Sequence, residues 1–360
     1  MLKNQLYVLL GLSISWTVIQ TVSLSTQAFG AAKEREISDC IGARISSWAP
    51  EWLKAEEIPA AFNEVPLLDG LWLGPMSFNS KSSTFAVKTS PVFEKLEPLV
   101  LKSPAVKCVG SFISNSGRAG FDPALGVAMI HSSTTSLAKF VADVHAKGWN
   151  ALQVDIESLP ESVAEDYEKF LDRLIQLCTP LHMRVSIALH AKTSSQGGYE
   201  GARFQRWEKL REKNLDLIVM AYDEHWSTSD PGPIASLKWV DAVVQYAQSV
   251  LPSDKFVLAL GNYGYRWTQV ATRNGKAKHW LGVPLMSFEL DRLVRSAKHA
   301  KNLPLADRAD GLKYMLGPHD VVAFEDSKSL KLKIDHFSSL KIPVQRFAIW
   351  RLGEGPVSKP

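Results

Sequence analysis

The sequence predicts an α/β fold, a (β/α)8 TIM barrel with a small insertion between the seventh and eighth strands. Its length of 360 residues suits one barrel of about 250 residues with additions. Short apolar runs alternate with longer amphipathic stretches, which is typical of parallel strands joined by crossover helices. Hydrophobic residues make up 46% and charged residues 22%, close to the average for globular proteins. This composition excludes disordered, collagen-like and multi-span membrane proteins.

Eight apolar runs are the predicted barrel strands. They span residues 42–48, 67–73, 105–113, 151–157, 184–190, 215–222, 256–260 and 346–350. Apolar residues from Val163 to Cys178 recur at three- and four-residue spacing, and a second stripe at 137–144 leads into the fourth strand, so both predict helices. The interval of about 266–326 is too long for a simple crossover, and we expect it to be the insertion.

Residues 1–32 have the pattern of a secretory signal. Lys3 precedes an uncharged run with an apolar core at 6–19, and small residues near Gly30 offer a cleavage site. We therefore expect export to the periplasm, the cell wall or the exterior, with the barrel domain in 36–360. An uncleaved anchor is the alternative, and only then is the membrane a partner.

The charge pattern gives little support to a nucleic-acid partner. The net charge is +4, and the 41 basic residues are interspersed with 37 acidic ones. Weak attraction to an anionic polymer such as a cell wall stays open, although a solvated mixed surface is the simpler interpretation.

The cysteines and two histidines predict no metal site. Cys40, Cys108 and Cys178 match no metal-ligand spacing and indicate no disulfide framework. We expect Cys108 and Cys178 to be small buried side chains. His190 and His225 end or follow predicted strands, but no cluster of ligands accompanies either one, so a structural role is expected for both. The alternative is that they line the cleft and bond sugar hydroxyls.

The polar residues of the fourth predicted strand are the candidates for chemistry. Gln153, Asp155 and Glu157 alternate with apolar residues, so their side chains share one face of the strand. Asp155 and Glu157 fall at the C-terminal mouth of the barrel, where barrel enzymes keep their catalytic groups. Two carboxylates about 7 Å apart can hold each other in different protonation states. The alternative is that they mark a solvated strand end.

The run from Asn150 to Glu157 resembles the D-G-x-D-x-D-x-E motif on the fourth strand of glycoside hydrolase family 18, the chitinase family. The branch with spore-cortex-lytic and cell-wall N-acetylglucosaminidases is the more similar one. Further segments that resemble that branch are 219–226, 231–233, 263–267, 324–326 and 349–354. The resemblance covers about 42–355. Asn150 and Gln153 stand where the motif has aspartates, which we expect to alter how Asp155 shares its proton.

The resemblance implies roles for seven residues. Glu157 corresponds to the general acid and base, Asp155 to the residue that orients the substrate's 2-acetamido group, and Tyr222 to a phenol that hydrogen-bonds that group. The implied substrate-binding residues are Gln153, Met220, Asp223 and Trp350. Met220 as a core residue and Trp350 as strand-end packing are the alternatives.

The function implied by the resemblance is a retaining glycosidase acting by substrate-assisted catalysis. Its substrates would be glycans containing β-linked N-acetylglucosamine: peptidoglycan, chitin oligomers or an acetylated exopolysaccharide. Neither a metal nor an organic cofactor is expected. A non-catalytic chitinase-like carbohydrate-binding protein and a structural protein of the envelope are the alternatives.

Overall fold

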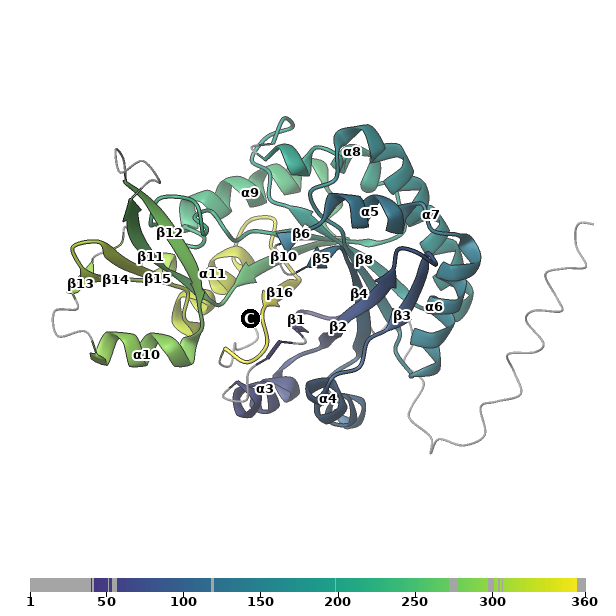
Figure 1. Ribbon diagram of the computed structural model, residues 1–360, viewed down its shortest axis with the longest axis horizontal. Helices are drawn as coiled ribbons and strands as arrows, with labels where there is room; N and C mark the ends of the chain where they lie inside the picture. Colours follow the sequence, from purple (N-terminus) through teal and green to yellow (C-terminus); the bar gives the residue numbers. More distant parts are fainter. Residues whose placement is uncertain are drawn as a thin grey trace, which may run out of the picture. The chain divides into compact units, whose positions relative to one another are not determined.

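Eight parallel strands close into a barrel in the computed structural model of the chain (Figure 1). In order around the barrel they are β1 (Ile45–Ala49), β2 (Gly70–Asn79), β4 (Cys108–Ser114), β7 (Ala151–Asp155), β8 (Arg184–His190), β9 (Asp216–Met220), β10 (Phe256–Gly261) and β16 (Phe347–Trp350). Strand β1 closes the ring because it pairs with both β2 and β16. The predicted fold and all eight predicted strands are confirmed. The fourth and sixth strands are shorter than predicted, so Glu157 and Tyr222 lie on loops beyond the strand ends.

The structure describes residues 40, 42–50, 52–53, 57–117, 120–197, 199–271, 278–296, 301–303, 305 and 307–354. All of them belong to one compact unit, Arg35–Pro360. The signal or anchor segment expected in 1–32 lies outside the described residues and stays a prediction. Within the described ranges, none of the helices combines the length and apolar character needed to cross a membrane.

Helices cover the outside of the barrel because their apolar stripes pack on the strands (Figure 1). The two predicted helices are confirmed as α6 (Thr134–Ala146), which buries Leu137 and Phe140, and α7 (Ala164–Cys178), which buries Tyr167 and Phe170. Each buried leucine or phenylalanine side chain contributes about 1.5–3 kcal/mol by its burial. The other helices around the barrel are α3 (Ile58–Glu64), α4 (Pro91–Lys102), α5 (Pro123–Ile130), α8 (Trp207–Leu210), α9 (Leu237–Val250) and α11 (Ser327–Ser338). The short elements are η1 (Val65–Leu67), β3 (Thr84–Val87), β5 (Ser116–Gly117), β6 (Gly120–Phe121), η2 (Glu161–Val163), η3 (Thr179–Leu181) and η4 (Glu200–Ala202).

Between β10 and β16 the chain forms a separate antiparallel sheet, drawn in green in Figure 1. Its strands, in spatial order, are β12 (Lys278–Leu285), β11 (Gly264–Ala271), β15 (Asp320–Phe324), β14 (Leu312–Gly317) and β13 (Lys301–Leu303), and α10 (Ser287–Ser296) follows β12. Tyr265 and Trp267 of β11 are buried with Tyr263, and Tyr222 and Trp350 from the barrel ends pack against them. The sheet therefore borders the C-terminal mouth of the barrel.

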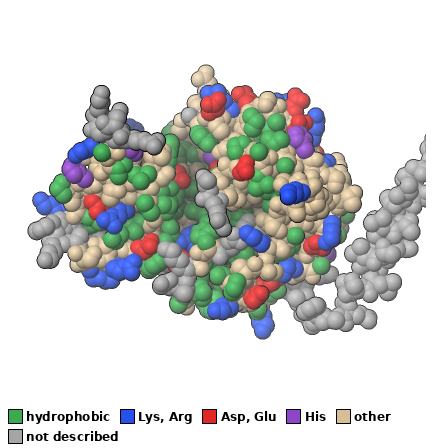
Figure 2. All heavy atoms as spheres, in the orientation of Figure 1, with side chains coloured by type: hydrophobic (Ala, Val, Ile, Leu, Met, Phe, Trp, Pro, Cys, Tyr) green, Lys and Arg blue, Asp and Glu red, His purple; other side chains and the backbone are tan. Residues whose placement is uncertain are grey.

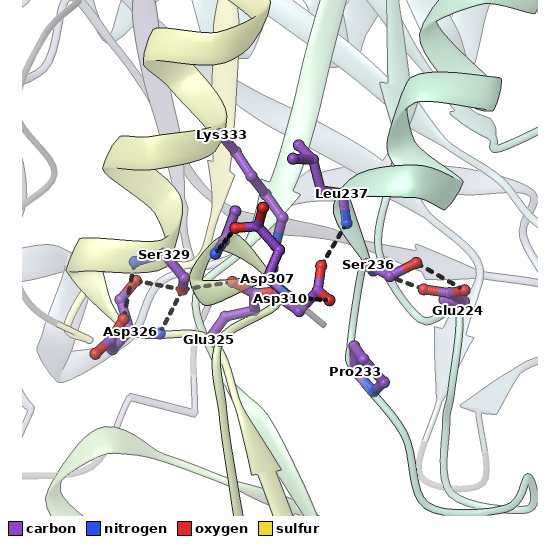
Figure 3. A network of polar contacts seen from close by, with 12 residues as sticks. Glu224, Pro233, Ser236, Leu237, Asp307, Asp310, Glu325, Asp326, Ser329 and Lys333 are labelled. Carbon is purple, nitrogen blue, oxygen red and sulfur yellow. Dashed lines mark hydrogen bonds and ion pairs between the residues drawn. The ribbon is translucent and has the colours of Figure 1, made fainter. Parts of the chain in front are cut away.

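A polar network ties this sheet to two barrel helices (Figure 3). The turn η5 (Arg308–Asp310) places Asp310 Oδ1 2.7 Å from the backbone N–H of Leu237, at the start of α9. At the end of β15, Glu325 forms a buried ion pair with Lys333 of α11 and accepts a hydrogen bond from Ser329 Oγ at 2.6 Å. Burial raises the pKa of Glu325, and the Lys333 ammonium opposes that shift. Because these groups would be costly to leave unpaired, the network fixes the sheet on the barrel.

The cysteines correct one prediction. Cys40 and Cys108 form a disulfide, with their Cα atoms 4.6 Å apart, so the expectation of no disulfide was wrong, although Cys108 is buried as predicted. The two residues are separated by 68 positions, and only the start of β4 brings Cys108 to the N-terminal end of the barrel beside Cys40. Cys178 is a free buried thiol, as predicted, and burial raises its pKa to about 12.

Candidate active site

The candidate acid lies just beyond β7 and is fixed through its backbone. Asn115, which directly follows β4, accepts a hydrogen bond from the Glu157 N–H and donates one to the Glu157 carbonyl oxygen, both at 2.9 Å. Asn115 is fully buried, so these bonds are shielded from water. Asn115 was not among the predicted site residues. The sequence pointed to Asn115 only by its position after the third predicted strand, which places it at the same mouth of the barrel as Glu157.

Asp155 and Glu157 are two neighbouring acids at the mouth of the barrel. Burial, followed by the negative charge of Glu157, raises the pKa of Asp155 well above its ordinary value, and a hydrogen bond to Ser114 opposes the shift. Asp155 therefore keeps its proton at pH values where an ordinary aspartate is charged. Glu157 itself is 8% exposed. The site holds a proton beside a carboxylate, which is the arrangement needed for acid catalysis.

Tyr222 and Asp223 reach the same site from the end of β9. Burial, together with the negative charge of Glu157, raises the pKa of Tyr222 well above its ordinary value, so its phenol stays protonated and can donate a hydrogen bond. Asp223 has a left-handed backbone, with φ of 59°, and its Oδ1 accepts a hydrogen bond from the Tyr263 hydroxyl. Burial raises the pKa of Asp223 to about 6.

Three further candidates lie at different depths. Met220 is buried at the end of β9. Gln153 is completely buried inside the barrel, where its Oε1 accepts a hydrogen bond from Trp48 Nε1, so it lies below the acids rather than on an open sugar-binding surface. Asn150 precedes β7, and its side chain bonds the backbone N–H of Val109 at 2.9 Å. It therefore holds the opposite end of the barrel and does not lie behind the acids.

Trp350 ends β16 and belongs to an aromatic cluster. The peptide bond that follows Trp350 is cis. The centre of its ring lies 5.7 Å from that of Trp48 and 6.3 Å from that of Trp52, and Trp48 stacks on Trp72 at 5.1 Å. Trp52 is 52% exposed and was not among the predicted site residues. A half-buried ring beside an exposed one offers an apolar platform for a sugar face.

The two histidines have different surroundings. Nδ1 of His225 lies 2.8 Å from the carbonyl oxygen of Pro233, which is the structural role that the sequence analysis expected. His190 Nε2, by contrast, lies 3.0 Å from Glu157 Oε2. For His190 the structure thus favours the alternative of a residue at the cleft over the structural role that was expected, because its strand end meets the loop that carries the acid.

In Figure 2, hydrophobic side chains gather on the part of the molecule formed by the antiparallel sheet and in the recess between that sheet and the barrel. A small enclosed cavity lies at the other end of the barrel, beside the disulfide and Arg184, Asp216 and Arg346, and we assign no chemistry to it. Within the described ranges, no group of three or more histidine, cysteine or carboxylate side chains is arranged to hold a metal ion.

Comparisons with known proteins point to one family. The model of glycosyl hydrolases family 18 matches residues 46–354. The cortical fragment-lytic enzyme of Bacillus subtilis (strain 168) is 24% identical over 249 residues, which cover 67% of this chain and 56% of that enzyme. The chain spans about half the length of the curated relatives it matches.

Solved structures share the fold. The spore cortex-lytic enzyme SleL of Bacillus cereus superposes with a TM-score of 0.68 at 19% identity, over 87% of this chain and 72% of that one. A variant of a family GH18 chitinase from Cycas revoluta, in complex with (GlcNAc)4, gives a TM-score of 0.65 at 17% identity, over 87% of this chain and 96% of that one.

Proposed function

Because the chain belongs to glycosyl hydrolases family 18, we propose that it is a retaining glycosidase that cuts glycans containing β-linked N-acetylglucosamine. The observation that carries the proposal is the pair of Asp155 and Glu157 at the mouth of the barrel, with the protonated phenol of Tyr222 beside them. Such a pair can keep one proton available for a leaving group. The described residues of this site offer no metal cluster, and the proposed chemistry requires none.

The proposed mechanism uses the substrate's own acetamido group as the nucleophile. The proton that Asp155 holds passes to Glu157, which gives it to the glycosidic oxygen while the acetamido carbonyl oxygen attacks the anomeric carbon. The glycosidic bond breaks, and a cyclic oxazolinium ion forms. Asp155 and Tyr222 hold the acetamido group in the attacking position. Glu157, now a carboxylate, then removes a proton from water as that water opens the ring. The two inversions leave the product with its original β configuration.

Binding of the sugar is assigned to the side chains around this pair. Trp350 would stack on the apolar face of the sugar, and Asp223 and Met220 would line the neighbouring subsite. Gln153 supports the site from below, since it is buried under the acids and bonded to Trp48.

We do not assign one polymer as the substrate. We infer only the sugar chemistry that the candidate polymers share. The similar enzyme is named for the lysis of cortical fragments, and the similar chitinase structure holds (GlcNAc)4. From these two proteins we infer for this chain only that its substrate contains a 2-acetamido sugar. Peptidoglycan, chitin oligomers and an acetylated exopolysaccharide all present it.

We also propose that the protein is exported. Disulfides persist mainly in oxidising compartments, and the Cys40–Cys108 bond agrees with the signal pattern of residues 1–32. Sequencing the N-terminus of the protein from its host tests the proposal, because a new start near residue 31 or 33 is expected. Recovery of an intact N-terminus in the membrane fraction would favour the anchor instead.

The proposed activity is tested with matched glycans. We expect N-acetylated oligomers to be cut with retention of the β anomer, which proton NMR of fresh digests reports, and fully de-N-acetylated oligomers to remain intact because they lack the attacking carbonyl oxygen. The Glu157→Gln variant should bind the sugar but lose about 10²- to 10⁴-fold in turnover, the usual value of general acid catalysis. Initial α product, or equal cleavage of both oligomers, would refute the mechanism. Thermal stabilisation by sugar without any cleavage would identify a carbohydrate-binding protein.

A further inference from the structure

The end of β8 brings a histidine against the candidate acid. His190 Nε2 lies 3.0 Å from Glu157 Oε2, and the two side chains are only 17% and 11% exposed. The distance is that of an ion pair, but the two atoms are not aligned as a hydrogen bond in the described structure. The Glu157 carboxyl group therefore lies close to His190, which ends β8, as well as to Asp155, which ends β7.

The position of His190 is set by its surroundings. Its backbone N–H donates to Oε1 of the fully buried Gln205 at 2.9 Å. The Tyr199 ring and the imidazole pack in an edge arrangement, with 5.1 Å between the ring centres, and the Tyr199 hydroxyl is 2.8 Å from Ser158 Oγ. Because Ser158 directly follows Glu157, the histidine and the acid are held by one continuous set of contacts.

Other titratable groups approach the pair from β7, β9 and β8. Asp155 ends β7, while Tyr222 and Asp223 follow β9, and the negative charge of Glu157 affects all three. Lys192, just beyond β8, directs its ammonium group to the backbone carbonyl of Gln205 at 2.7 Å. The imidazole is thus the side chain from β8 that meets the Glu157 carboxyl group.

On the basis of the proposed function, we propose that His190 is a positioning residue that orients the Glu157 carboxyl group and stabilises its carboxylate form during the reaction. An imidazole N–H can donate to a carboxylate oxygen, and a small rotation of either side chain would align the contact. Glu157 loses its proton to the glycosidic oxygen in the first step and regains one from water in the second. A donor at Oε2 favours the carboxylate between these steps and leaves Glu157 Oε1 for the substrate.

This role predicts an effect on turnover rather than on binding. His190→Phe keeps a ring against Tyr199 but removes the donor, and it should lower kcat about tenfold to a hundredfold while KM changes little. His190→Gln retains an N–H and should recover most of the loss. The matched control is His225→Gln, because His225 lies on the loop after β9 and bonds a backbone carbonyl instead of Glu157.

A second measurement does not depend on activity. Chemical denaturation of the wild type, Glu157→Gln, His190→Phe and the double variant forms a double-mutant cycle. If the two side chains interact, the changes in denaturation midpoint are not additive. Additive changes, or a His190→Phe variant with wild-type kcat, would overturn the proposal. If the wild type cuts none of the glycans, the proposed function has failed, and the cycle alone decides whether His190 holds Glu157.

Discussion

At the scale of single residues, burial in the site changes the pH at which Asp223 loses its proton. Its backbone lies in the left-handed region, which Asp and Asn adopt more readily than most residues. Its carboxyl group is buried beside Tyr263 and near Glu157, and burial raises its pKa to about 6. Ionising Asp223 therefore costs more free energy in the folded protein than in the unfolded chain, where an aspartate ionises at about pH 3.9.

The pH dependence of stability follows from that shift. A carboxyl group with a raised pKa stabilises the folded state fully below about pH 4, and this contribution is lost as the pH rises through about 6. Asp223→Asn removes the charge, keeps an oxygen for the Tyr263 hydroxyl and suits the left-handed backbone. We expect the variant to unfold at a higher temperature than the wild type at pH 7.5 and to lose this advantage by pH 4. Thermal unfolding of both proteins at several pH values measures the difference in unfolding temperature. A difference that does not vary with pH would contradict the raised pKa of Asp223.

Site residues differ in how far the sequence reveals them. Asp155 was predictable because the period-two pattern of 151–157 assigns polar residues to one face of a strand at a barrel mouth. Asn115 and the contact of His190 were not, because β7 ends at Asp155 and the path of the following loop decides what meets Glu157. A strand pattern carries no information about a loop beyond the strand.

At the scale of elements, Asn115 joins the end of β4 to the loop after β7. Asn115→Ala would leave the N–H and carbonyl of Glu157 without these two partners in a buried position, at a cost of about 1–3 kcal/mol in the free energy of unfolding. Turnover should fall about a hundredfold, because a displacement of about 1 Å in a catalytic group is sufficient for such a loss.

A matched control separates stability from positioning. Asn150 also bonds backbone groups of a neighbouring segment, the Val109 N–H and the Lys107 carbonyl, but at the opposite end of the barrel. Asn150→Ala should destabilise the protein to a similar degree and leave kcat near the wild-type value. Equal losses of kcat in both variants would mean that Asn115 acts only through stability.

At the scale of the whole molecule, local sequence patterns were sufficient to predict the barrel strands but not the pairing that closes the barrel. Apolar runs and amphipathic stripes identified the eight strands and the helices α6 and α7. Pairing of β1 with β16 joins Ile45 to Phe347, and such distant partners leave no periodic signal in the chain. The disulfide was missed for the same reason, since its cysteines are brought together only when the first and third barrel strands are in place.

The disulfide gives a prediction for the stability of the whole barrel. A bond that closes a loop of 68 residues removes conformational freedom from the unfolded chain, and this stabilises the folded state by about 4 kcal/mol. Cys40 and Cys108 lie at the N-terminal end of the barrel, away from Glu157 at the mouth, so activity at low temperature should be unaffected by reduction. We expect a reductant to lower the unfolding temperature of the wild type by roughly 5–10 °C. The Cys40→Ala/Cys108→Ala double variant should unfold at that lower temperature with or without reductant. An unchanged unfolding temperature after complete reduction, verified by thiol titration, would show that the closed loop contributes little and that packing between β1 and its neighbours holds this end of the barrel.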